Sequence, residues 1–375
     1  MRKIGAILLG ISVVIAIFFF LKVKQFYSKV YTPTGRSVGP SAEKTAYNIL
    51  LLGYGGGGHE GAYLTDTMMV LHFDLQTKKA TLISLPRDLW VKIPTKSGQD
   101  FHAKINALYE MELFSGDFPD LDPKYLGTAD DAALVKYLVG QVTGQFIDNY
   151  VGLDFGSFRK AIDLLGGVDI DVEKTFDDDE YPNEDIKKDD PCGKTGDELA
   201  EAEKMATTDA KLAFPCRYEK IHFNRGPTHM DGATALKYVR SRHSSQDGGD
   251  FGRAARQQRL LEAVREKVLA VSFLPKVIPL MDELQKYVRM DISPDEVKKF
   301  LIELPQAKSY GLWRLVLTDK NYLVSAFSPD KQYILIAADG TDKWDSVKKA
   351  ITNAFVGIIP TPAPTTTGPV KINKQ

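Results

Sequence analysis

The sequence predicts an α/β protein, organised as an α-β-α three-layer sandwich around a central mixed sheet and preceded by an N-terminal transmembrane helix. Three observations lead to this prediction. Short apolar runs of strand length alternate with segments of helical periodicity, which indicates helices packed on a sheet. The composition, with 43% hydrophobic and 26% charged residues, is that of a globular protein. The first 21 residues contain an uncharged, mostly apolar run long enough to cross a bilayer.

That run extends from Ile4 to Leu21 and has basic residues at positions 2, 3, 22 and 24. As a helix it would span roughly 27 Å, close to the thickness of the hydrocarbon core. Because no small-x-small cleavage site follows it, the pattern favours an uncleaved signal anchor over a cleaved signal peptide or a buried soluble helix. We therefore expect residues 1–24 to form a cytoplasmic stub and a single-pass anchor in the cell membrane, with the body extracytoplasmic.

The folded body is expected at 46–357, after a linker at 25–45 and before a Pro- and Thr-rich disordered tail at 358–375. The body opens with a fully apolar strand, and apolar strands and helical periodicity then alternate to its end. The expected strands lie at 48–53, 68–74, 80–85, 150–154, 168–172, 312–318 and 333–337. The expected helices lie at 103–114, 129–145, 155–165, 197–206, 232–239, 250–271, 276–287 and 341–354. A further helix is predicted to start after Ser293, with Pro294 at its first position and Glu296 completing a capping box.

Residues 174–220 interrupt this pattern and are predicted to be a surface insertion. Acidic residues cluster at 177–180 and 185–190, and we expect them to form a solvated face, since no EF-hand spacing supports a calcium site. The insertion contains both cysteines of the chain, Cys192 and Cys216. A disulfide would close a loop of about 25 residues and stabilise the fold by about 3 kcal/mol. Two buried free thiols are the alternative, and both remain open. The spacing is not a zinc pattern.

The net charge of −1 provides no general attraction for nucleic acid or an anionic surface, so anion binding must come from a local basic cluster. The segment 240–257 contains one. On a helix, Arg253, Arg256 and Gln257 share a face, and Arg240 and Arg242 share a side if that stretch is extended. Guanidiniums are costly in a core but match phosphate oxygens bidentately. The cluster therefore predicts a diphosphate site, and a solvated basic helix paired with the acidic insertion is the alternative.

A second group of polar residues follows the first strands. Arg87 and Asp88 come directly after the strand at 80–85, where α/β proteins bind ligands, although a salt-bridged turn explains them equally well. Lys104 and Asn106 are predicted to add a phosphate contact. Asp66, at the start of a strand, is the best candidate for a metal ligand.

Several chemistries are excluded by the motifs. The glycine-rich stretch 53–61 is not a P-loop, because no Gly-Lys-Ser/Thr follows and the chain continues into a strand. The sequence contains no serine nucleophile elbow, no Cys/His pair motif and no zinc-binding His motif. This pattern favours catalysis by positioning and electrostatics, as in phosphoryl transfer.

Taken together, the motifs resemble the LytR-CpsA-Psr family over about residues 46–290. The motifs that carry the resemblance are Thr65-Asp-Thr, Leu85-Pro-Arg-Asp, Lys104-Ile-Asn, Tyr150-Val-Gly-Leu-Asp, Asp163-Leu-Leu-Gly-Gly-Val, Arg240-Ser-Arg and Asp250-Phe-Gly-Arg-Ala-Ala-Arg-Gln. The N-terminal anchor agrees with it.

The resemblance implies a phosphotransferase of the cell wall. Such an enzyme transfers a phospho-glycan from a polyprenyl-diphosphate carrier to a peptidoglycan sugar hydroxyl and releases polyprenyl phosphate, with Mg²⁺ as cofactor and no nucleic acid as partner. By motif, Asp66 would hold the metal, and Asp154 or Asp250 would orient arginines or accept a proton. The residues implied in binding the diphosphate and its surroundings are Arg87, Lys104, Asn106, Arg240, Arg242, Arg253, Arg256 and Gln257.

Two positions depart from the family pattern. Gly55 stands where members usually carry an aspartate, and Leu64-Thr65 replaces the Arg-Ser that often precedes Asp66. One metal ligand and one guanidinium are therefore missing, and His59 or Glu60 is our hypothesis for a substitute ligand. A lipid-binding module without turnover is accordingly the second interpretation. A transcription regulator is the third, and the anchor and the absence of a helix-turn-helix or a net basic face count against it.

Overall fold

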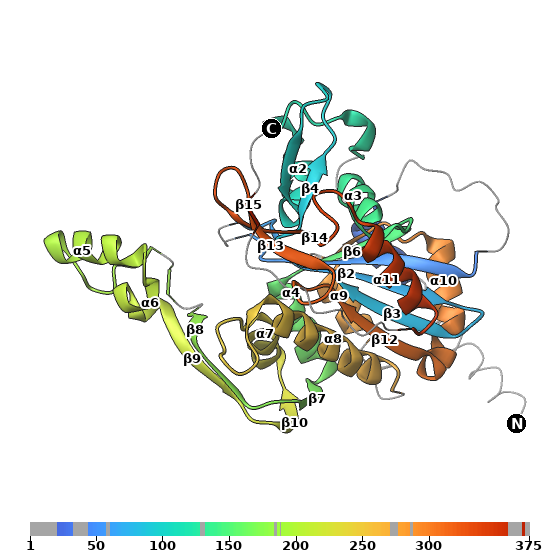
Figure 1. Cartoon of the computed structure of the whole chain (residues 1–375). Coiled ribbons are helices and arrows are strands. Elements are labelled where there is room, and N and C mark those ends of the chain that lie inside the picture. The colour runs from blue at the N-terminus through green and yellow to red at the C-terminus, as the bar shows by residue number, and fades with distance from the viewer. Residues whose placement is uncertain are drawn as a thin grey trace, which may run out of the picture. The chain divides into compact units, whose positions relative to one another are not determined.

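The computed structural model describes residues 21–32, 44–57, 61–127, 132–183, 186–187, 189–270, 277–285, 288–358 and 370–371 (Figure 1). The predicted membrane span lies outside these residues, apart from Leu21. Within the described ranges, no helix combines the length and the apolar character needed to cross a membrane. The chain divides into a first unit, Met1–Leu165 with Arg265–Gln375, and a second unit, Gly166–Val264.

The first unit is built on a six-stranded mixed sheet of order β11-β6-β1-β2-β3-β12. Its strands are β1 (Ala46–Tyr54), β2 (Thr65–Asp74), β3 (Lys79–Ser84), β6 (Asn149–Asp154), β11 (Arg289–Met290) and β12 (Gly311–Val316). β1 runs parallel to β6, β12 runs parallel to β3, and β2 lies antiparallel between β1 and β3. The carboxyl ends of β1, β3, β6 and β12 therefore share one edge with the start of β2. The central strands are continuously apolar because the sheet buries them; Leu50, Val70 and Ile83 are fully buried.

Helices cover this sheet. They are α2 (Leu108–Leu113), α3 (Ala133–Thr143), α4 (Phe155–Leu165), α9 (Val277–Leu284), α10 (Pro294–Glu303) and α11 (Asp345–Phe355). α11 packs on α3, β3 and β12, and α4 packs on β6 and α9. The predicted capping box of α10 is confirmed: the Ser293 hydroxyl accepts from the Glu296 amide, and the Glu296 carboxylate accepts from the Ser293 amide.

The remaining elements of the first unit are short. They are β4 (Trp90–Ile93), β5 (Phe101–Lys104), η1 (Ile105–Ala107), η2 (Ser115–Asp117), η3 (Pro123–Tyr125), η6 (Leu304–Ser309), β13 (Leu323–Phe327), β14 (Tyr333–Ala337) and β15 (Val370–Lys371). The helix predicted at 103–114 is wrong over its first residues, since Ala103 and Lys104 pair with β4 and the α-helix begins only at Leu108.

The linker predicted at 25–45 is packed on the body over its first part. Residues 21–30 are helical, Val30 is buried, and the Thr32 amide donates to the Met290 carbonyl at 3.0 Å. Tyr27 donates its hydroxyl hydrogen to the Ile292 carbonyl, and Lys22 pairs with Asp282 at 2.8 Å. The sequence analysis did not indicate this packed helix, because Thr, Pro and Gly from residue 32 onward set the composition of the stretch.

The second unit contains two antiparallel pairs, β7 (Val168–Val172) with β10 (Gly226–Met230), and β8 (Phe176–Pro182) with β9 (Tyr218–Phe223). Its helices are α5 (Gly196–Ala206), α6 (Ala210–Ala213), η4 (Pro215–Arg217), α7 (Gly232–Arg240) and α8 (Gly249–Val268), the last of which continues into the first unit. The predicted insertion is the long β8–β9 hairpin with α5 and α6 at its tip (Figure 1). The strands of this unit form two-stranded sheets separate from the six-stranded one.

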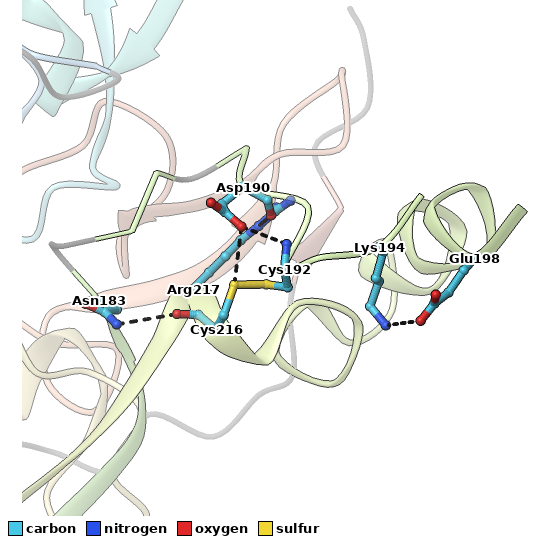
Figure 2. The surroundings of a disulfide bond; sticks show 7 residues. All are labelled: Asn183, Asp190, Cys192, Lys194, Glu198, Cys216 and Arg217. Atoms are coloured by element: carbon cyan, nitrogen blue, oxygen red, sulfur yellow. Dashed lines mark hydrogen bonds and ion pairs between the residues drawn. A yellow bond between two sulfur atoms is a disulfide. The ribbon is translucent and has the colours of Figure 1, made fainter. Parts of the chain in front are cut away.

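A disulfide joins Cys192 to Cys216 at the hairpin tip, which decides between the two alternatives left open by the sequence (Figure 2). The tip has a small apolar core of its own, in which Ala202, Ala213 and Phe214 are buried and Cys192 packs against them. Asp190 accepts from the Cys192 amide at 2.7 Å. A core of this size contributes little hydrophobic stabilisation, so the crosslink is expected to carry much of the stability of the tip.

Replacing both cysteines by serine is expected to destabilise the tip by about 3 kcal/mol, because the unfolded loop regains its conformational freedom. Faster amide exchange and faster proteolysis over 192–216 would show this, while the six-stranded sheet keeps its exchange rates. Unchanged protection of the tip under reducing conditions would contradict the prediction.

Candidate functional site

At the carboxyl edge of the first unit's sheet, two basic and two acidic side chains alternate in contact. Arg87 follows β3 and donates from Nη1 to Oδ1 of Asp66, at the start of β2, over 2.6 Å. Its Nε lies 3.7 Å from Oδ2 of Asp88, and Lys104 Nζ lies 2.7 Å from Oδ1 of the same carboxylate. The structure therefore brings three of the predicted site residues, Asp66, Arg87 and Lys104, together. The salt-bridged turn is also present, and it holds the two basic groups in fixed positions.

Asn106 contributes to this edge through its backbone. Its amide donates to the Arg87 carbonyl at 3.2 Å, and its carbonyl accepts from the Thr65 hydroxyl at 3.2 Å. Asn106 is buried. It therefore ties the turn that carries Arg87 to the start of β2.

Asp154 lies at the same edge, because Tyr54 is the register partner of both Thr65 and Asp154. Its Oδ1 accepts from the amide of Ser157 at 2.8 Å and from the Ser157 hydroxyl at 2.7 Å, which caps α4. Gly56 has φ +83°, and a Cβ there would lie 2.9 Å from Cβ of Asp154. Burial, with the Asp154 charge as the next cause, raises the pKa of Tyr54 to about 12. The Tyr54 phenol is therefore neutral at physiological pH. The two hydrogen bonds from Ser157 fix the orientation of the Asp154 carboxylate beside it.

The side chains at this edge fit a magnesium ion whose other ligands come from substrate phosphates and water better than an ion bound by protein ligands alone. Within the described residues, one group of three potential ligand side chains lies close enough for a metal, and it is Asp190 with the disulfide-bonded Cys192 and Cys216, which cannot act as thiolates. Among the described residues Asp66 therefore belongs to no group of three such ligands, and Mg²⁺ commonly takes one or two carboxylates with substrate phosphates and water. His59 and Glu60 lie outside the described residues, so the hypothesis of a substitute ligand stays a prediction.

In the second unit, Arg256 is fully buried, with 0% of its surface exposed. Its Nε donates to the Tyr238 carbonyl at 2.8 Å, its Nη2 donates to the Ser241 carbonyl, and its Nη1 donates to the carbonyl and the carboxylate of Asp247. The guanidinium carbon lies 4.8 Å from the centre of the Phe176 ring. Burial lowers the pKa of Arg256, and the Asp247 charge opposes this. All three nitrogens of the group are bonded to protein acceptors.

The other members of the predicted cluster fall into two groups. Arg253 and Gln257 are buried, at 6% and 8% exposure, and Gln257 Nε2 donates to the Val239 carbonyl at 3.4 Å. Arg240 and Arg242 are half-buried, and Arg240 Nη1 donates to the Tyr181 hydroxyl at 3.4 Å. Residues 253, 256 and 257 thus share a face as the spacing predicted, and that face is buried, so the alternative of a solvated basic helix is wrong. The side chain of Asp250 is outside the described part.

Sequence reasoning missed two carboxylates of this unit, Asp178 and Asp247. Asp178 lies in the acidic run that we predicted to be solvated, yet it is fully buried and accepts from the Ser241 hydroxyl at 2.7 Å. That prediction is therefore wrong at Asp178. Asp247 belongs to a tight loop in which the Gly249 amide donates to the Arg242 carbonyl at 2.6 Å. The Gly248-Gly249 pair after Asp247 was a turn signal that could have drawn attention to this loop.

Comparison with known proteins decides the family. A model of the LytR_cpsA_psr family matches residues 17–335. The chain belongs to the LytR-CpsA-Psr family. The resemblance based on the motifs is thereby confirmed, and the mixed α/β fold with its central mixed sheet agrees with solved structures of such proteins.

Two curated relatives of this LytR-CpsA-Psr chain are teichoic acid transferases. The polyisoprenyl-teichoic acid–peptidoglycan teichoic acid transferase TagU of Enterococcus faecalis is 24% identical over 322 residues, covering 82% of this chain and 84% of TagU. TagV of Bacillus subtilis, named in the same way, is 26% identical over 253 residues, covering 67% of this chain and 51% of TagV.

The crystal structure of B. subtilis TagV matches with TM-score 0.55 at 22% identity, covering 85% of this chain and all of that chain. A structure of TagT bound to LIIa-WTA matches with TM-score 0.52 at 19% identity, covering 87% of this chain and 97% of that chain.

Proposed function

We propose that this protein transfers a phospho-glycan from a polyprenyl-diphosphate carrier to a sugar hydroxyl of peptidoglycan and releases polyprenyl phosphate. It is a phosphotransferase of the glycopolymer–peptidoglycan ligase type. Two curated relatives carry names that describe this kind of transfer, and the family model matches residues 17–335. The observation that carries the proposal for this chain is the Arg240–Arg242 segment: it presents two half-buried guanidiniums, and Ser241 between them is held by the buried charges of Asp178 and Arg256.

In this mechanism the protein contributes positioning and positive charge. Arg240 and Arg242 bind phosphate oxygens and stabilise the charge that develops on the leaving polyprenyl phosphate. Arg253 and Gln257 line the same segment of the second unit. Asp250 is proposed to orient an arginine or to accept the proton of the attacking hydroxyl.

The first unit supplies Arg87 and Lys104 as phosphate-binding groups and Asn106 as the residue that ties their turn in place. Asp66 would hold Mg²⁺, which neutralises phosphate charge when bound. The Asp154 carboxylate caps α4, and we propose that it orients neighbouring groups at this edge.

The cellular setting is proposed from the N-terminus and the disulfide. Residues 1–24 anchor the chain by one span, and the body, with helices on both faces of its sheet, lies outside the cytoplasm. The Cys192–Cys216 bond supports an oxidising compartment. Membrane, polyprenyl-linked glycan and peptidoglycan are accordingly the partners.

The test is turnover by the full chain purified in detergent, supplied with a polyprenyl-diphosphate oligosaccharide, peptidoglycan fragments and Mg²⁺. Mass spectrometry should detect polyprenyl monophosphate together with a phosphodiester-linked glycan. Intact lipid that stays bound under every metal and acceptor would overturn the proposal. It would favour the non-catalytic lipid-binding module, which the Gly55 departure makes the second candidate.

A further inference from the structure

A buried carboxylate holds the segment that follows α7. Asp178 of β8 is fully buried, and its Oδ2 accepts from the Ser241 hydroxyl at 2.7 Å, from the Arg242 amide at 2.9 Å and from the His243 amide at 3.1 Å. Its Oδ1 accepts from the Glu180 amide at 3.0 Å. The irregular pairing of β8 with β9 just after Asp178 frees that amide from the strand ladder. Both oxygens of the carboxylate are therefore engaged.

The same segment is held through its carbonyl groups by a cation. Arg256 donates to the Tyr238 and Ser241 carbonyls, and the Asp178 charge is among those that raise the pKa of Arg256. The Ser241 hydroxyl and the amides of residues 242 and 243 thus donate to a buried anion, and the Tyr238 and Ser241 carbonyls accept from a buried cation. Because the two charges offset each other, a carboxylate can lie beneath an anion-binding segment without repelling the ligand strongly.

The hydrogen bonds at position 178 require a carboxylate. The four donors approach both oxygens, and an aspartate is an acceptor on both, whereas an asparagine would turn a donor toward one set. Burial by itself would raise the pKa of Asp178, but the hydrogen bonds outweigh it and hold that pKa below its ordinary value. The carboxylate is therefore charged throughout the neutral range.

We propose that Asp178 is a positioning residue, which fixes the backbone at Arg242 and so directs the Arg242 guanidinium toward the phosphates of the diphosphate ligand. This inference rests on the proposed function. The hydrogen bonds at the amides of residues 242 and 243 set the direction of the Arg242 side chain before the ligand arrives, which lowers the entropy cost of binding. Through Asp178 alone, the β8–β9 hairpin thereby supports the segment that carries Arg242.

The experiment compares Asp178→Asn with Asp179→Asn in the full chain in detergent. Asp179 is the neighbouring residue of β8 and is half exposed, so its variant makes the same charge change without the buried hydrogen bonds. Binding of inorganic pyrophosphate is measured by calorimetry, and KM and kcat are measured in the transfer assay. Amide exchange at Arg242 and His243 and the unfolding midpoint report on local and global structure.

For Asp178→Asn we expect the Kd of pyrophosphate and the KM of the polyprenyl-diphosphate substrate to rise by about tenfold, the equivalent of one charge-assisted contact. kcat should change by about threefold at most, exchange at residues 242 and 243 should accelerate, and Asp179→Asn should match the wild type. If Asp178→Asn does not fold, Ser241→Ala removes one of the donors to Asp178 and should raise the same Kd by about threefold.

The outcomes separate the two proposals. A folded Asp178→Asn, or Ser241→Ala in its place, that binds pyrophosphate as tightly as the wild type overturns the positioning role and leaves the proposed function intact. A wild-type chain that neither binds pyrophosphate nor transfers glycan overturns the proposed function and the inference with it.

Discussion

Replacing Arg242 with glutamine is expected to lower kcat/KM for glycan transfer by about a hundredfold, with little change in stability. Arg242 is half-buried, and its backbone amide, which a substitution keeps, donates to Asp178. The glutamine therefore leaves that framework in place while removing a bidentate, charge-assisted contact with phosphate. Two such hydrogen bonds contribute about 3 kcal/mol, and each 1.4 kcal/mol corresponds to a tenfold change in rate.

A matched control exists on the preceding helix. Lys237 of α7 pairs with Glu219 at 2.6 Å and belongs to no predicted site. Lys237→Gln removes the same charge five residues earlier and should retain activity. Steady-state kinetics and unfolding midpoints of both variants make the comparison. If the two variants lose activity equally, the effect is one of general charge, and Arg242 does not bind the phosphate.

The fold of the first unit could be predicted because its buried strands are continuously apolar in sequence and its helix ends carry capping residues. Strand β1 is apolar on both faces, which predicts a buried strand, and the predicted range 48–53 lies within Ala46–Tyr54. The start of α10 followed from local chemistry alone, since Ser293 and Glu296 satisfy each other's backbone donors. Such features depend on neighbours in the chain.

The second unit was harder because its stability depends on charges buried far from each other in sequence. The run Phe176-Asp-Asp-Asp-Glu-Tyr181 has the composition of a solvated loop, and we predicted one. In a strand, however, Asp178 shares a face with buried Phe176, and three of its four donors lie more than sixty residues later. The alternation of buried and exposed positions along the strand could have indicated that Asp178 faces inward. Composition does not show that a carboxylate at this position accepts from four donors.

The candidate site shows the same limit. Spacing correctly placed Arg253, Arg256 and Gln257 on one face of α8. It could not tell whether that face meets a ligand or the end of α7. For Arg256 the structure shows protein acceptors at all three nitrogens. Its predicted role in gripping the diphosphate therefore competes with a structural one, and a single substitution can separate them.

Replacing Arg256 with lysine is expected to destabilise the second unit by about 3 kcal/mol, although the charge is retained. An ammonium cannot span the Tyr238 and Ser241 carbonyls and Asp247 together, so at least one buried carbonyl loses its donor. Gly252 adds to the constraint, because a Cβ there would lie 2.3 Å from the Asp247 carbonyl oxygen; the first turn of α8 packs too closely to adapt.

Arg259→Lys is the control for this variant. Arg259, one turn later on α8, pairs with the exposed Glu173, and exposed ion pairs contribute about 1 kcal/mol or less. Because the chain has two units, amide exchange resolved along the sequence is the suitable measurement, with transfer activity measured in parallel. Loss of protection over 238–249 together with loss of activity supports the structural role. Loss of activity with protection unchanged would show instead that Arg256 acts on the substrate, because a group that only holds the loop cannot affect turnover while the loop stays intact.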